Sequence, residues 1–316
     1  MTEPQNDKSG ELQGMMVFLA SLSHGLESTL GRGASTITFR AGRSIGLKDK
    51  ASRTTSDPID ALRLLRQKLE ELGIDWPFEV WQKQGASTPY YEKEGGLGFD
   101  LLSSLSGERV TIGHANGIIT LDLAETLDAY RENLRVRLGE PYRTMLGHFR
   151  HEIGHYYQWV LVTSDEQWAA CRALFGDERA SYQDAIQRHY REGAPVDWAD
   201  SFISEYATMH PWEDFAESFA HYLHITGTLA TAAAAGVILS VDRVQGIIDH
   251  DVVPEGDYSA LGIDRMLDDW HWLSLMFNRV NRSMGQSDLY PFTLTEPVIA
   301  KLRFAHDLVS SSPTSG

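Results

Sequence analysis

Cysteine is almost absent from this sequence of 316 residues, which contains only Cys171. A single thiol cannot form an internal disulfide, and a zinc ribbon built on paired cysteines is excluded as well. Cys171 lies in an apolar helical pattern, where we expect a buried and unreactive thiol. The chain must therefore rely on an apolar core, for which its length and its 42% of hydrophobic residues suffice.

Positive charge is also scarce. Lys and Arg number 28 against 44 Asp and Glu, so the formal net charge is −16. Phosphate backbones and anionic lipid surfaces are bound mainly through Lys and Arg, so we expect neither a nucleic acid nor a membrane as partner. The first sixty residues hold seven acids and seven bases, which places the whole acidic surplus beyond them.

Long hydrophobic runs are missing too, since no stretch approaches the roughly 18 apolar residues of a membrane-spanning helix. The early run from Met15 to Ala20 follows Glu3, Asp7 and Glu11. A signal peptide would have a basic segment there. We therefore expect a soluble, cytoplasmic protein, whose oligomeric state the sequence leaves open.

The pattern of elements indicates an ordered domain behind a looser N-terminal region. Residues 1–56 are rich in Gly, Ser and Thr, and predict a flexible or loosely packed segment with one possible strand at 35–40. Order begins with a helical pattern after Asp57, and residues 309–316 predict a disordered tail. The ordered part is thus expected to span residues 57–308.

Strand patterns precede helical ones in this ordered part. Short strands are expected at 78–81, 98–101, 110–112 and 118–123, the last two joined by a turn at Asn116-Gly117. Helices are expected afterwards, over 141–162, 164–176, 177–190, 197–209, from Pro211 onward, 229–248 and 261–280. A small sheet followed by a helical bulk predicts the α+β class, with a small mixed sheet and a mostly helical C-terminal part.

The strongest chemical signal is His-Glu-x-x-His at His151, Glu152 and His155. Residues four apart lie on one face of a helix, so both imidazoles can reach one ion. Two imidazoles and a carboxylate suit zinc, and a glutamate beside the open coordination position can take a proton from water. The motif lies within the long helix expected at 141–162, which favours a metal site there.

A catalytic zinc site needs a third protein ligand, and two acids downstream are candidates. Glu213 and Glu217 are one helical turn apart, and His221 continues the same stripe. Spacing alone does not decide which acid binds the metal. We expect His148, His210, His221 and His224 to have structural roles.

These motifs resemble those of a known family. His-Glu-x-x-His followed by Glu-x-x-Ala-Glu is similar to the pattern of the gluzincin metallopeptidases, including the catalytic domain of anthrax lethal factor. Segments 139–157, 173–180 and 210–217 resemble the bacterial family of putative zinc-binding metallopeptidases. The resemblance covers about residues 60–308. It implies a zincin-like catalytic domain over 57–308, with an active-site helix carrying the first motif.

The resemblance also implies roles for individual residues. His151, His155 and Glu213 would bind one Zn²⁺ per chain, and Glu152 would be the general base. Tyr206 would donate a hydrogen bond to the oxyanion, and Glu217 would hold a ligand histidine in its tautomer. Members of the family typically begin with a cysteine-rich zinc ribbon, which a chain with one cysteine cannot form.

The expected function is that of a zinc-dependent hydrolase cleaving peptide bonds, with a peptide or protein as substrate. The hairpin at 110–123 is the expected edge for an extended substrate. Two alternatives remain open. One is a non-catalytic zinc-containing module that binds a protein partner through its acidic surface, and the other is an amidase acting on a non-peptide amide.

Overall fold

The computed structural model describes residues 37–41, 97–102, 104, 110–115, 118–122, 144–244 and 248–311. Four strands come first: β1 Ile37–Ala41, β2 Leu97–Leu102, β3 Gly113–Ala115 and β4 Ile118–Asp122. The helices follow: α5 Met145–Leu161, α6 Asp165–Phe175, α7 Tyr182–Glu192, α8 Pro211–Ala234, α9 Ile263–Ser283 and α10 Glu296–Ser311. The order is that of a small sheet followed by helices, as the sequence predicts.

By its contacts the chain divides into two compact units, and the division falls within α5 after Glu152. The first unit contains the sheet, whose strands lie in the order β1-β2-β4-β3. β1 and β4 each pair with β2 in parallel, whereas β3 pairs with β4 antiparallel, so the sheet is mixed as expected. Ile119 and Leu121 on β4 are fully buried.

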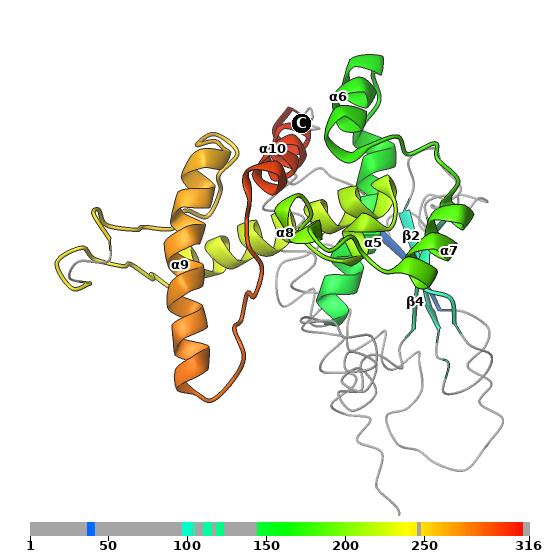
Figure 1. The fold of residues 1–316 in the computed structure, drawn as a ribbon. Helices are drawn as coiled ribbons and strands as arrows, with labels where there is room; N and C mark the ends of the chain where they lie inside the picture. Colours follow the sequence, from blue (N-terminus) through cyan, green and yellow to red (C-terminus); the bar gives the residue numbers. More distant parts are fainter. Residues whose placement is uncertain are drawn as a thin grey trace, which may run out of the picture. The chain divides into compact units, whose positions relative to one another are not determined.

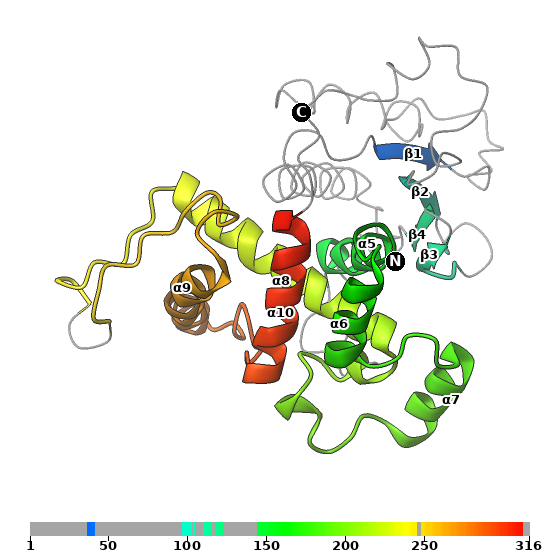
Figure 2. The same ribbon diagram turned by 90° about the horizontal axis from the view of Figure 1, so that it is seen from above.

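The second unit is organised around α8. Helices α6, α9 and α10 all contact it, with α6 and α10 beside its first half and α9 beside its far half (Figures 1 and 2). Phe215 and Phe219 stack along α8 with ring centroids 5.9 Å apart, and Phe175 of α6 packs 5.3 Å from Phe215. Among the described residues, no helix is both long and apolar enough to cross a membrane.

Helix ends that are marked by a capping residue, a glycine or a proline lie where the sequence predicts them. Ser164 caps α6 by accepting a hydrogen bond from the backbone N–H of Gln167, and Gly176 follows the helix with φ +96°. Pro211 opens α8, where its missing N–H costs no hydrogen bond. The expected strand at 98–101 is present as β2.

Other predicted elements are wrong in extent or type. The helix expected at 197–209 is replaced by two short 3₁₀ turns, η3 Trp198–Asp200 and η4 Tyr206–Thr208. There the Ser204 and Thr208 hydroxyls take backbone hydrogen bonds, which compete with helical ones. The helix expected from 177 begins only at Tyr182, because residues 178–180 form a turn and Ser181 caps the helix.

The C-terminal half and the hairpin also differ from the predicted elements. No helix spans 229–248, since α8 ends at Ala234 and Leu239 pairs with Val252 as an isolated bridge. Helix α10 was not anticipated, and it includes residues 309–311 of the expected tail. β3 lies three residues later than expected, because the pairing of Ala115 with Ile118 continues the hairpin to the turn. The patterns expected after Asp57 and at 78–81 lie outside the described residues, as does most of 1–56.

Candidate metal centre

The two histidines of the first motif lie one turn apart on α5, which is continuous from Met145 to Leu161. Both are partly exposed. Gly154, between them, lies against α8, where a Cβ atom would stand 2.7 Å from Ala216 Cα. The absence of a side chain at Gly154 therefore lets the backbones of α5 and α8 approach closely.

The start of α8 is fixed by His210. Its Nδ1 accepts a hydrogen bond from the backbone N–H of Trp212, which makes His210 the N-cap, and its Nε2 lies 3.0 Å from Ala180 O. Glu213 thus falls in the first helical turn, where the helix dipole favours a negative charge. Glu213 is 2% exposed.

These elements bring three candidate ligands together. One ligand atom from each of His151, His155 and Glu213 lies within 4.8 Å of the other two. His155 Nε2 lies 3.4 Å from Glu213 Oε2. Two ligand atoms about 2.1 Å from a zinc ion and at a tetrahedral angle are about 3.4 Å apart. The donor types and this separation therefore fit zinc.

Glu152, adjacent to the first histidine, is 8% exposed. Its Oε2 is buried and makes no hydrogen bond within the described part of the chain. A buried carboxylate oxygen without a partner is costly to a folded protein. A catalytic role is one of the usual reasons for such an unsatisfied carboxylate oxygen.

Glu217 is anchored to the segment that precedes α8. Its Oε2 accepts a hydrogen bond of 2.6 Å from the Ser204 hydroxyl, which in turn accepts one from the backbone N–H of Ala207. Glu217 thereby joins α8 to the segment that carries η4. Of the two candidate acids, only Glu213 belongs to the three-residue cluster found among the described residues.

Tyr206 lies in η4 and is 42% exposed. Its ring meets that of His189 of α7 edge to face, with centroids 6.3 Å apart. The side chain therefore has access to solvent and to a ligand.

The remaining histidines of the stripe have structural contacts. His221 Nδ1 lies 2.8 Å from the Tyr290 hydroxyl, and its ring packs against Phe292. Burial lowers the pKa of His221 to about 4. His224 packs edge to face against His221.

Two residues at the site were missed by sequence reasoning. The Tyr182 hydroxyl donates a hydrogen bond of 2.8 Å to Glu213 Oε1. Lys301 Nζ of α10 lies 2.7 Å from Oδ2 of Asp214, the residue after Glu213. Burial raises the pKa of Asp214 to about 7, although Lys301 opposes the shift. The sequence offers one indication of Tyr182: it lies two residues after the segment 173–180, one of the three segments that resemble the metallopeptidase family.

Comparison with known proteins extends this picture. A family model described as "Putative zinc-binding metallo-peptidase" matches residues 73–308. The uncharacterized protein Mb2598c of Mycobacterium bovis and the uncharacterized protein Rv2568c of Mycobacterium tuberculosis are each 50% identical to this chain over 219 residues. The matches cover 69% of this chain and 61% of each relative, so the chain spans about three fifths of their length. No solved structure matches. With most of its length covered by one family model and a His-His-Glu cluster at the crossing of α5 and α8, the chain belongs to the family of putative zinc-binding metallo-peptidases.

Proposed function

We propose that this protein is a zinc-dependent hydrolase of the gluzincin type that cleaves peptide bonds in a zincin-like catalytic domain. His151, His155 and Glu213 would hold one Zn²⁺ per chain. The observation that carries the proposal is the convergence of these three ligand atoms within 4.8 Å, next to the buried carboxylate of Glu152.

Bound zinc would supply Lewis acidity that polarises the scissile carbonyl and activates a water molecule. Glu152 would accept the proton of the attacking water at its carboxylate and pass it to the nitrogen of the leaving amine. Its Oε2 has no hydrogen-bond partner among the described residues, which leaves a lone pair for this proton.

Tyr206 and Glu217 have supporting roles in the proposal. The exposed Tyr206 would donate its hydroxyl proton in a hydrogen bond to the carbonyl oxygen as negative charge develops there. Glu217, which lies one turn after Glu213 and is hydrogen bonded to Ser204, would hold a ligand histidine in its tautomer.

The test compares the wild type with Glu152→Gln, which keeps the size of the side chain and removes its basicity. Elemental analysis should find about one zinc per chain in both proteins, because the ligands are unchanged. A peptide library should be cleaved by the wild type, with a chelator abolishing cleavage, and left intact by Glu152→Gln.

Each alternative gives a distinct result. A wild-type chain that binds no zinc would overturn the proposal. A zinc-loaded wild type that binds a protein partner but cleaves no amide would indicate a non-catalytic module. Cleavage of non-peptide amides alone would indicate an amidase.

A further inference from the structure

The two oxygens of Glu213 have different partners. Oε1 accepts the hydrogen bond of 2.8 Å from the Tyr182 hydroxyl, and Oε2 lies 3.4 Å from His155 Nε2. A carboxylate held at one oxygen in this way presents the other to a metal. The hydrogen bond from Tyr182 to Oε1 therefore determines the orientation of the Glu213 carboxylate.

The ring of Tyr182 is itself held in place by aromatic neighbours. It meets His210 edge to face at 5.2 Å between centroids and lies 6.0 Å from Trp212. Both neighbours belong to the start of α8, immediately before Glu213. The hydroxyl is thus aimed by the same turn that carries the ligand.

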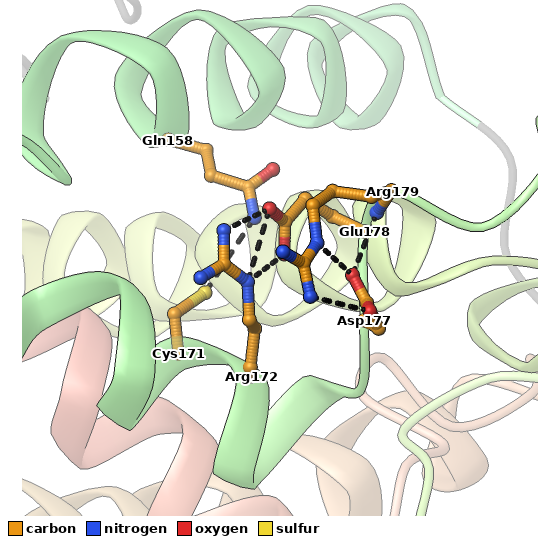
Figure 3. A network of polar contacts seen from close by, with 6 residues as sticks. All are labelled: Gln158, Cys171, Arg172, Asp177, Glu178 and Arg179. Carbon is orange, nitrogen blue, oxygen red and sulfur yellow. Dashed lines mark hydrogen bonds and ion pairs between the residues drawn. The ribbon is translucent and has the colours of Figure 1, made fainter. Parts of the chain in front are cut away.

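The backbone before Tyr182 is anchored from two sides. Arg172 of α6 binds Glu178 through Nε at 3.0 Å and Nη2 at 2.6 Å, and Glu178 is 8% exposed (Figure 3). The carbonyl of Ala180 meets His210 Nε2 at 3.0 Å. These contacts join α6, the segment before α7 and the start of α8. None of them involves a metal, so they can place the hydroxyl before metal binding.

We propose that Tyr182 is a positioning residue for the metal ligand Glu213: it holds Oε1, keeps Oε2 toward His155 and thereby sets the affinity for zinc. The inference rests on the metal site of the proposed function. Partners that orient metal ligands typically contribute 10–100-fold to metal affinity. Tyr182 would reach that effect through one hydrogen bond, without touching the metal.

The test removes only the hydroxyl, by Tyr182→Phe, which preserves the ring contacts with His210 and Trp212. Tyr190→Phe is the matched control, because Tyr190 lies on the same helix and is 77% exposed. Zinc dissociation constants are measured by competition with a chromophoric chelator. We expect about 10–100-fold weaker binding for Tyr182→Phe and no change for Tyr190→Phe. Thermal unfolding of the metal-free proteins checks that both variants fold.

A double-mutant cycle separates positioning from a general structural effect. In a Glu213→Ala background the hydroxyl has no ligand to orient, so adding Tyr182→Phe should weaken zinc binding no further. If the two effects simply multiply, or if Tyr182→Phe alone binds zinc like the wild type, the positioning role is overturned and the metal site stands. If the wild type binds no zinc, the proposed function falls first, and the inference falls with it.

Discussion

Gly154 of α5 and Ala216 of α8 lie in close contact where the two ligand-bearing helices meet. A Cβ atom on Gly154 would lie 2.7 Å from Ala216 Cα and 2.9 Å from its carbonyl oxygen. Gly154 directly precedes His155, and Ala216 is three residues after Glu213. The backbone contact therefore sets how near the histidine and the carboxylate can come.

Replacing Gly154 with alanine should consequently push α8 away from α5. We expect a loss of about 1–3 kcal/mol in the free energy of unfolding, typical of overpacking, together with weaker zinc binding. Gly256→Ala is the control, since a Cβ atom there would meet nothing within 4 Å. Urea unfolding and chelator competition measure the two effects. Equal stability of the two variants would show that the helices can separate without cost.

The buried pair of Lys301 and Asp214 leads to a second prediction. The Lys301 ammonium also donates to Ser201 O at 2.7 Å and lies 4.2 Å from the ring centroid of Phe202. Lys301→Met would leave the Asp214 carboxylate, which is 1% exposed, without its counter-charge. Because the pKa of Asp214 is raised to about 7 even beside Lys301, the carboxyl would take up a proton in the variant. We expect a loss of about 1–3 kcal/mol from unmade hydrogen bonds, measured by chemical unfolding.

The double variant Lys301→Met/Asp214→Leu checks this explanation. It removes both charges, so most of the lost stability should return. If the double variant is no more stable than Lys301→Met, packing of the lysine chain and not its charge is what matters.

The two arginine–carboxylate pairs of Figure 3 allow a matched comparison. Arg172–Glu178 is largely buried on the carboxylate side, whereas Arg179–Asp177 is exposed on both sides. Burial raises the pKa of Glu178, but the hydrogen bonds and positive charge of Arg172, together with a backbone hydrogen bond, outweigh burial and the net shift is downward. Glu178→Gln can keep a neutral hydrogen bond to Arg172 but loses the charge, and should therefore cost about 1 kcal/mol, the difference between charge-assisted and neutral hydrogen bonds. Asp177→Asn should change the unfolding midpoint little, because exposed pairs contribute little. The reverse order in thermal unfolding would contradict this assignment.

His221 predicts that stability falls in mild acid. Burial lowers its pKa to about 4, whereas the pKa of a histidine in the unfolded chain is near 6.5. Between these values the unfolded chain binds the extra proton, so stability is lost as pH falls from 6.5 toward 4. The groups that face the ring are the Tyr290 hydroxyl, His224 and Phe292, with Glu217 one turn before on α8.

The measurement is urea unfolding of metal-free protein at pH 7 and pH 5, compared with His221→Gln, which can still bond Tyr290. The wild type should lose about 2 kcal/mol more than the variant between these two conditions. An equal loss in both proteins would show that other groups carry the acid sensitivity.

The sequence predicts those features that depend on near neighbours. Ser164 and Gly176 delimit α6 because capping acts over three or four residues. The His151–His155 pair follows from the helical period alone. Glu213 needed the second motif and the family resemblance, since the spacing did not separate it from Glu217.

The features that escaped prediction depend on partners far along the chain. Tyr182 meets Glu213 across 31 residues, and nothing around Tyr182 marks it as a partner of a carboxylate. The same holds for Lys301, whose hydrogen bond to Ser201 O spans 100 residues. The prediction of a helix at 197–209 was wrong because side-chain hydroxyls bind backbone groups that a helix would use. The Ser204 hydroxyl accepts from the N–H of Ala207, and the Thr208 hydroxyl donates to Glu205 O.

The pairing of Asp214 with Lys301 also has a consequence for the order in which the protein is made. All three candidate zinc ligands have been synthesised once the ribosome reaches Glu213, but the cation that neutralises the neighbouring carboxylate arrives only with α10. A nascent chain that ends between the two would carry the ligands on an α8 whose first turn contains an unpaired acid. The contacts around the metal centre are therefore complete only after translation of a helix that supplies none of its ligands.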